Sequence, residues 1–509
     1  MVELPVKFLE MLADAVGPKR AETIAAAIRE TPPVLSIRIN PYKWREDGVV
    51  DSVVSGCYEN GEAASGDGAG FPAPPPDAAT LAPQATPPAS IPWCPAGIYL
   101  ATRPVFTLDP ALHAGAYYVQ EPSSMIIELL KQFLEKMDLN LRLLDLCAAP
   151  GGKSTHLASI MPQGSKLVAN EVIRPRAAIL RENISRWGLP NVEVTSMDPS
   201  QFAPRGYAFD FILVDAPCSG EGMFRKDPES VKEWSPESVQ LCASRQQRIV
   251  ADIWPSLEPG GLLAYSTCTM NRSENEENVA WIIETLGAER VSFDPEILSQ
   301  LRSNGVIVTP QGELRLHPGL VKGEGLFFAL LRKPADSLPQ EELPQKSTES
   351  RFPNSGIKDF KSGNQKDFKS GNQKDFISEN HKSGNFKSGY QKSSGSGHNT
   401  NKSDRSDQMF AKNGKPPKNN FHQQNSPVQN VQPEHEVALS TTYTGEWPSV
   451  EVTKELALTY LSKGTLNLPD SPLGYLRITY GGLGLGFVKN IGSRANNLLP
   501  PNLRIRMQF

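Results

Sequence analysis

The sequence lacks any apolar run long enough to cross a bilayer. About 18 to 20 consecutive apolar residues are needed for that, and no run in this chain approaches this length. The opening segment, MVELPVKFLEML, is mixed and amphipathic, without the features of a secretory signal. We therefore expect a soluble, cytoplasmic protein that makes no membrane contact.

Cysteine and histidine are also scarce. The 509 residues contain six cysteines and seven histidines, and no two cysteines have C-x-x-C spacing. A disulfide scaffold needs denser cysteines, and a structural metal site needs paired ligands. We expect free thiols and no bound metal.

The chain carries little net charge, only −4. No global basic field attracts nucleic acid, so any surface of that kind must be local. At roughly 150 residues per domain there is room for about three domains, which excludes a single small module. Nothing in the composition predicts a stable oligomer, and we expect a monomer.

Two stretches have compositions that do not support a packed core. One is rich in Gly, Ala and Pro, and the other repeats KDFKSGNQ around Phe360, Phe368 and Phe376. The second is also net basic, which leaves a choice between a weak RNA-binding arm and a solvated tether. The tether is favoured. The predicted division is an N-terminal domain at 1–46 and 92–135, a disordered insertion at 47–91, a central domain at 136–334, a low-complexity linker at 335–437 and a β-rich domain at 438–509.

The central domain alternates short apolar runs with longer amphipathic ones. Runs such as LRLLDL, KLVAN and FDFILVD alternate with helical stretches at 175–187 and 236–257. This alternation predicts a Rossmann-like α/β domain, with a parallel sheet covered by helices on both faces. Amphipathic spacing at 4–42 predicts a small α-rich leading domain.

A glycine turn follows the first of these strands. LRLLDLCAAPGGKSTH joins a strand to a helix start, a geometry that points backbone N–H groups at a ligand. A P-loop would require glycine where Cys147 stands, so an NTPase is disfavoured. A nucleotide-like ligand without a triphosphate fits better.

Two acids follow the next two strands. Glu171 is placed to accept hydrogen bonds from ribose hydroxyls, and Asp198 is placed to face an adenine edge. Each acid alone is better explained as a helix cap or a surface carboxylate. In this order after the glycine turn, they predict an adenosine site.

Two later strands end in cysteine-containing turns. FDFILVDAPCSGEG places Asp215 and Cys218 after one strand, and GLLAYSTCT places Cys268 after another. Buried cysteines are commonly inert. A thiolate, however, is the nucleophile needed to attack carbon 6 of a pyrimidine before carbon 5 accepts a methyl group.

These motifs resemble those of a known family. LDLCAAPGGKSTH, DFILVDAPCSGEGMFRKDP and YSTCTMNRSENEENV are similar to the cofactor and catalytic motifs of the NOL/NOP/Sun family of RNA 5-methylcytosine methyltransferases, above all its bacterial RsmF type. SIRINPYK, PWCPAGIYL and HAGAYYVQEPSSM resemble the leading RNA-binding domain of that type. YGGLGLGFVKN and NLLPPNLR resemble its PUA-like tail.

The resemblance implies a cofactor and a set of binding residues. The cofactor is S-adenosylmethionine, with Glu171 at its ribose, Asp198 at its adenine and Asp215 between cofactor and base. The loop expected to wrap it consists of Cys147, Ala148, Ala149, Pro150, Gly151, Gly152 and Lys153.

The resemblance also implies catalytic roles and a substrate. By this resemblance, Cys268 is the nucleophile and Cys218 assists product release. The expected substrate is a cytosine of RNA, in small-subunit (16S) ribosomal RNA. The triplet at 277–279 also occurs in DNA cytosine methyltransferases, in which the cysteine after proline attacks, and the presence of Cys268 disfavours that alternative. The rival from another class is an RNA-binding assembly factor with a degenerate site. The intact cysteines and glycine turn argue against it.

Overall fold

The computed structural model describes residues 3–43, 89–335 and 431–507. The predicted insertion and linker therefore lie mostly outside the described residues. Within the described residues, no helix is both long and apolar enough to cross a membrane.

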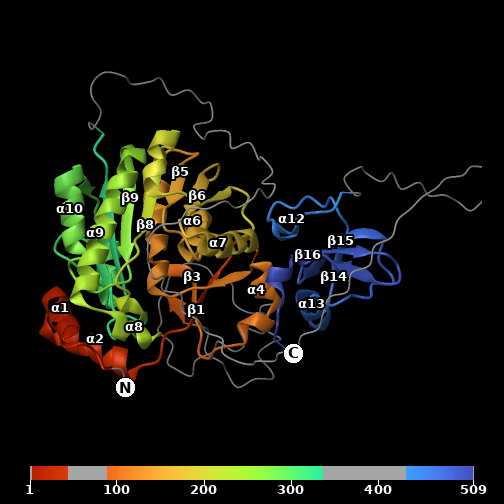
Figure 1. Cartoon of the computed structure of the whole chain (residues 1–509), viewed down its shortest axis with the longest axis horizontal. Coiled ribbons are helices and arrows are strands. Elements are labelled where there is room, and N and C mark those ends of the chain that lie inside the picture. The colour runs from red at the N-terminus through yellow and green to blue at the C-terminus, as the bar shows by residue number, and fades with distance from the viewer. Residues whose placement is uncertain (1–2, 44–88, 336–430, 508–509) are drawn as a thin grey trace, which may run out of the picture. The chain divides into compact units, whose positions relative to one another are not determined.

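The chain begins with two amphipathic helices, α1 (Val6–Val16) and α2 (Pro18–Glu30). Their buried faces pack on side chains that follow the turn of Cys218. The Phe8 ring lies 5.1 Å from that of Phe224 and 5.8 Å from that of Trp234. The expected helices are thus present, and they cover the central domain (Figure 1).

The leading region also contains a four-stranded antiparallel sheet in the order β2-β3-β1-β4. Its strands are β1 (Ser36–Ile39), β2 (Ser90–Ile91), β3 (Cys94–Tyr99) and β4 (Tyr117–Val119). The α-rich prediction missed most of this sheet because its strands are short and far apart in sequence. β2 also lies within the range predicted as an insertion, since Ile91 is buried against the core.

Short helices connect this sheet to the central domain. They are the 3-10 helices η2 (Phe106–Leu108) and η3 (Ser123–Leu130), and the α-helices α4 (Pro110–Ala114) and α5 (Lys131–Leu134).

A nine-stranded sheet forms the centre, in the order β11-β12-β13-β9-β8-β5-β6-β7, with β10 paired to β13. The strands are β5 (Arg142–Asp145), β6 (Lys166–Asn170), β7 (Val192–Thr195), β8 (Phe209–Asp215), β9 (Leu257–Thr267), β10 (Glu289–Arg290), β11 (Ile307–Val308), β12 (Leu314–Leu316) and β13 (Leu326–Arg332).

The prediction of a parallel sheet was right for five strands and wrong at one side. β5 to β9 are parallel, but β13 runs antiparallel to β9 and to β12. The loop between β12 and β13 contains no crossover helix, and parallel neighbours need one of a dozen residues or more.

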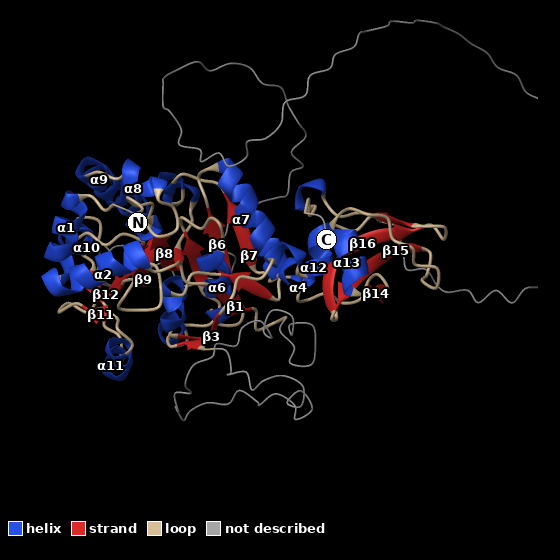
Figure 2. Cartoon of the chain, turned by 90° about the horizontal axis from the view of Figure 1, so that it is seen from below, coloured by secondary structure: helices blue, strands red, loops and turns tan. Residues whose placement is uncertain are grey.

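Helices cover both faces of this sheet. Leu144, Ile212 and Leu263 pack with α9 and α10, whereas their chain neighbours Leu143, Leu213 and Leu262 pack with η3, α6 and α11. Figure 2 shows α9 and α11 on opposite sides of the strands. The helices are α6 (Gly152–Ile160), α7 (Arg174–Trp187), α8 (Glu229–Glu233), α9 (Pro236–Ile253), α10 (Glu276–Leu286) and α11 (Pro295–Ser303), and the 3-10 turns are η4 (Pro199–Gln201), η5 (Ala203–Arg205), η6 (Glu221–Met223) and η7 (Trp254–Ser256).

The C-terminal region contains the expected small sheet, in the order β14-β15-β16-β17. Helix α12 starts inside the predicted linker, because Ala438 and Leu439 are buried and the Ala438 carbonyl accepts a hydrogen bond from Arg477 Nε. The elements are α12 (His435–Leu439), β14 (Ser449–Glu451), α13 (Lys454–Leu461), β15 (Gly474–Tyr480), β16 (Leu483–Asn490), β17 (Ala495–Asn497) and η9 (Pro501–Leu503).

Gly115 offers a test of how the leading sheet docks on α7. A Cβ at this residue would lie 1.8 Å from the Arg186 carbonyl oxygen, whereas Gly206, with nearly the same φ of +78°, has nothing within 4 Å. Gly206→Ala should lower the free energy of unfolding by about 1 to 2 kcal/mol, because alanine is strained in the left-handed backbone conformation. Gly115→Ala should cost roughly 3 kcal/mol or more, because backbone must move. Urea unfolding measures both, and equal losses would contradict this docking.

Candidate active site

A cavity of about 170 Å³ lies at the carboxyl end of β5, beside the glycine turn. The turn leads directly into α6, so its backbone forms one wall and the β4–η3 segment forms the other. The residues that line it are Tyr118, Val119, Gln120, Glu121, Ser124, Asp145, Cys147, Ala148, Ala149, Pro150, Gly152, Lys153 and Asp215. Of the predicted loop, all but Gly151 therefore line this cavity.

Glu171 and Asp198 do not line the cavity. Glu171 is buried after β6, where its carboxylate accepts a hydrogen bond from the Ile173 N–H at 2.9 Å and pairs with Arg176 at 3.1 Å. Asp198 is exposed and caps η4 through Ser200, as a structural acid does. Their assignment to ribose and adenine stays a prediction.

Asp145 is a cavity residue that the sequence analysis did not select. It is fully buried, its Oδ2 accepts a hydrogen bond from Ser154 Oγ at 2.7 Å, and its Oδ1 has no partner among the described residues. Burial raises the pKa of this carboxyl to about 7, with a further contribution from Asp215. The signal was available, since Asp145 ends the strand before the glycine turn.

Gln120 contributes a second unpaired polar atom to the same cavity. Its Oε1 accepts a hydrogen bond from Arg38 Nε at 2.7 Å, which orients the amide, and its Nε2 has no partner among the described residues. An acceptor at Asp145 and a donor at Gln120 thus remain available to a ligand.

Lys153 and Asp215 form an ion pair of 2.9 Å at the end of β8. Asp215 Oδ1 also accepts a hydrogen bond from Ser266 Oγ at 2.8 Å, from the neighbouring strand β9. Burial lowers the pKa of the Lys153 ammonium group. The negative charge of Asp215, and after it the influence of Cys268, raises this pKa by more, so the net shift is upward. This places a fixed positive charge close to Cys268.

The two predicted catalytic cysteines meet. Cys218 Sγ and Cys268 Sγ lie 3.1 Å apart, and both residues are partly exposed. The hydrogen bond to Cys268 and burial raise the pKa of the Cys218 thiol well above its usual value. Cys218 therefore keeps its proton at neutral pH and has a proton to donate.

One group of metal-type ligands occurs among the described residues, away from this site. Cys94 Sγ, Glu128 Oε2 and His156 Nε2 lie within 4.8 Å of one another. Arg38 is buried close enough to shift the pKa of Cys94 and of His156. A buried guanidinium there opposes a divalent cation, and the His156–Glu128 hydrogen bond of 2.8 Å already pairs two of the three groups.

Three family models match the chain. Residues 132–332 match "16S rRNA methyltransferase RsmB/F", residues 75–122 match the "N-terminal domain of 16S rRNA methyltransferase RsmF" and residues 448–505 match the "Methyltransferase RsmF PUA domain". The matches follow the order of the three predicted domains.

Curated relatives are similar over about half of the chain. The ribosomal RNA small subunit methyltransferase F of Escherichia coli is 38% identical over 278 residues, which make up 54% of this chain and 57% of that protein. The protein of the same name from Shigella boydii is equally similar. The chain thus spans little more than half the length of these relatives.

Two solved structures superpose on this chain. PH0851 superposes with a TM-score of 0.53 at 22% identity, over 65% of this chain and 66% of that one. NSun6 from Pyrococcus horikoshii with SFG gives a TM-score of 0.49 at 20% identity, over 65% and 98%. The likeness to PH0851 supports the mixed α/β architecture of the central domain.

The raised pKa of Asp145 predicts a pH dependence of stability. The folded state holds this proton up to about pH 7, whereas the unfolded chain releases it near the ordinary aspartate pKa of 3.8. Stability is therefore lost as pH rises through this window, by up to about 4 kcal/mol. The variant Asp145→Asn should not show this loss. Its free energy of unfolding, measured relative to that of the wild type, should therefore be higher at pH 8 than at pH 4. A difference that is equal at both pH values would contradict this.

Proposed function

We propose that this chain, which carries an RsmB/F-family methyltransferase domain between RsmF-type N-terminal and PUA domains, methylates carbon 5 of a cytosine in small-subunit ribosomal RNA. The observation that carries the proposal is the pair of thiols 3.1 Å apart at the ends of β8 and β9, beside the Lys153–Asp215 ion pair. A thiol pair next to a cavity lined by the glycine turn suits attack on a pyrimidine ring.

The lining of this cavity suits the amino-acid end of S-adenosylmethionine, which would supply an electrophilic methyl group. Asp145 Oδ1 is a free acceptor for an ammonium group, and Gln120 Nε2 is a free donor for a carboxylate. The backbone of the loop from Cys147 to Lys153 would surround this ligand. Glu171 would hold its ribose and Asp198 its adenine.

The chemistry on the base would belong to the two cysteines and their neighbours. The Cys268 thiolate would attack carbon 6, which makes carbon 5 nucleophilic. Asp215 would lie between cofactor and base, held by Lys153 and Ser266. After methyl transfer and removal of the carbon-5 proton, the protonated Cys218 would assist breakage of the bond to Cys268.

The flanking domains would position the RNA. In the C-terminal domain Lys489, Arg494, Arg504 and Arg506 are all exposed, and Lys489 lies over the Tyr475 ring at 5.0 Å. Exposed cations beside an aromatic ring suit contacts with phosphates and bases. We assign the chain an action in the cytoplasm as a monomer. The N-terminal domain would include β2, the catalytic domain would span 136–334, and the PUA-like domain would begin with α12.

The cysteine roles predict opposite covalent phenotypes. Cys268→Ala should abolish methyl transfer and the denaturant-resistant complex with RNA that contains 5-fluorocytidine, because fluorine blocks the final proton removal. Cys218→Ala should accumulate protein joined to ordinary methylated RNA, since release fails. Gel mobility after denaturation and transfer of a labelled methyl group measure both.

Cys242→Ala serves as the matched control, since this thiol is partly buried on α9 and takes no part in the contact between Cys218 and Cys268. An adduct formed by Cys268→Ala would reject the nucleophile. The absence of any methylation by the wild-type chain on small-subunit RNA would favour the RNA-binding assembly factor. Bisulfite sequencing of RNA from cells with and without the gene would identify the nucleotide.

The cofactor assignment predicts that Glu171→Ala weakens S-adenosylmethionine binding by about 1 to 3 kcal/mol, the usual cost of losing hydrogen bonds to a charged acceptor. Isothermal titration calorimetry measures this. Glu193→Ala, an exposed carboxylate on the neighbouring strand β7, should bind as the wild type does. Equal affinity in both variants would refute the placement of the ribose.

A further inference from the structure

Two buried carboxylates connect the turn that holds Cys218 to the turn that holds Cys268. Glu221 belongs to the first turn and Glu274 to the segment after Cys268, and their side chains are at most 1% exposed. Each carboxylate accepts hydrogen bonds from the other segment. The connection is therefore reciprocal.

Glu221 holds the segment that follows the nucleophile. Its Oε2 accepts hydrogen bonds from the backbone N–H of Met270 at 2.5 Å and of Asn271 at 3.1 Å. Its Oε1 accepts from Asn271 Nδ2 at 2.9 Å and from Trp234 Nε1 at 3.0 Å. All four partners are N–H donors, so both carboxylate oxygens have a full set of donors.

Glu274 holds the segment that follows the second cysteine. Its Oε2 accepts a hydrogen bond from the Ser219 N–H at 3.0 Å, next to Cys218, and from Gln246 Nε2 at 2.7 Å. Its Oε1 accepts from Asn271 Nδ2 at 2.9 Å, a group shared with Glu221. The two carboxylates thus converge on one amide.

The turns also touch directly. The Gly222 N–H donates to the Cys268 carbonyl at 2.8 Å, and a Cβ at Gly222 would lie 2.4 Å from that oxygen. Ser219 Oγ and Thr269 Oγ1 lie 3.1 Å apart. The approach is so close that a shift of either turn must move the other.

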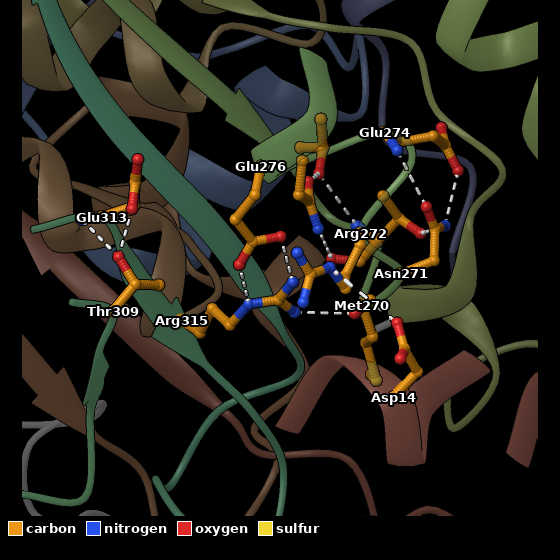
Figure 3. A network of polar contacts seen from close by, with 12 residues as sticks. Asp14, Met270, Asn271, Arg272, Glu274, Glu276, Thr309, Glu313 and Arg315 are labelled. Carbon is orange, nitrogen blue, oxygen red and sulfur yellow. Dashed lines mark hydrogen bonds and ion pairs between the residues drawn. The ribbon is translucent and has the colours of Figure 1, made fainter. Parts of the chain in front are cut away.

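A third charged group supports the segment from its other side. Arg315, on β12, is 1% exposed and donates to the Met270 carbonyl at 2.7 Å. It also forms a paired contact with Glu276, at the start of α10 (Figure 3). The Met270 peptide is therefore held at its N–H by Glu221 and at its carbonyl by Arg315.

We infer that Glu221 and Glu274 are positioning residues that set the distance between the two thiols, Glu221 chiefly for the attack by Cys268 and Glu274 chiefly for the release assisted by Cys218. The inference rests on the proposed function. A carboxylate is required at both places, because glutamine would turn an NH2 group towards N–H donors and lose an acceptor.

The test compares Glu221→Gln and Glu274→Gln in the full chain. Glu221→Gln should slow formation of the 5-fluorocytidine adduct by about tenfold or more, the cost of a small displacement of a reacting atom, with unchanged S-adenosylmethionine affinity. Glu274→Gln should form this adduct at the wild-type rate but release ordinary methylated RNA about tenfold more slowly. A purely structural role would not separate the two steps.

Glu313→Gln is the matched control. Glu313 is 3% exposed and paired with Arg290, but it contacts neither cysteine turn. It should leave both steps unchanged. Wild-type rates in both Glu221→Gln and Glu274→Gln would overturn the inference. The absence of an adduct in the wild type would instead refute the proposed function.

A second measurement needs no RNA. The thiols lie 3.1 Å apart and need to approach by only about 1 Å to reach a disulfide S–S length. The oxidant diamide should therefore join them rapidly in the wild type. Diamide takes up both thiol hydrogens and is itself reduced to the hydrazine. Glu221→Gln and Glu274→Gln should both form this disulfide several-fold more slowly, as mass spectrometry of peptides would show. Equal rates would overturn the inference.

A back-up variant is available if Glu221→Gln does not fold. Trp234→Phe removes one donor to Glu221, and it should slow adduct formation about threefold. An unchanged rate of adduct formation in Trp234→Phe would contradict the positioning role of Glu221.

Discussion

The parallel pairing of β8 with β9 is the constraint on which the site depends. This pairing sets Asp215 opposite Ser266, so the two turns that follow must leave the sheet side by side. Because both strands are buried on both faces, their register cannot slip without exposing the core. Cys218 and Cys268, 50 residues apart, are consequently brought into contact.

Much of this arrangement was predictable from the sequence, for a physical reason. The strands of the central sheet are short apolar runs bounded by turn residues, and polar residues directly after such runs gather at one edge of a parallel sheet. That rule placed the glycine turn, Asp215, Cys218 and Cys268 in one region, and the structure confirms that they lie together.

The remainder depended on contacts that no local pattern records. The antiparallel β13 and the leading sheet arise from pairing between distant segments, as with Ile37 between Ile98 and Val119. Asp145 and Gln120 matter through unpaired atoms, which only coordinates reveal. Conversely, Asp198 satisfied the rule for strand-end acids, yet it is exposed and bonded within its own turn.

The two thiols differ in environment, and this asymmetry bears on their proposed roles. A nucleophile must be deprotonated, and Cys268 lies near the positive charge of Lys153. Cys218 has its pKa raised by its hydrogen bond to Cys268 and by burial, so it is protonated and can donate to its neighbour. A thiol that keeps its proton beside a thiol that lies near a positive charge suits attack followed by elimination. A site built this way works only while the sulfur–sulfur distance is kept short, and that distance is governed by the backbone of both turns rather than by the cysteine side chains alone.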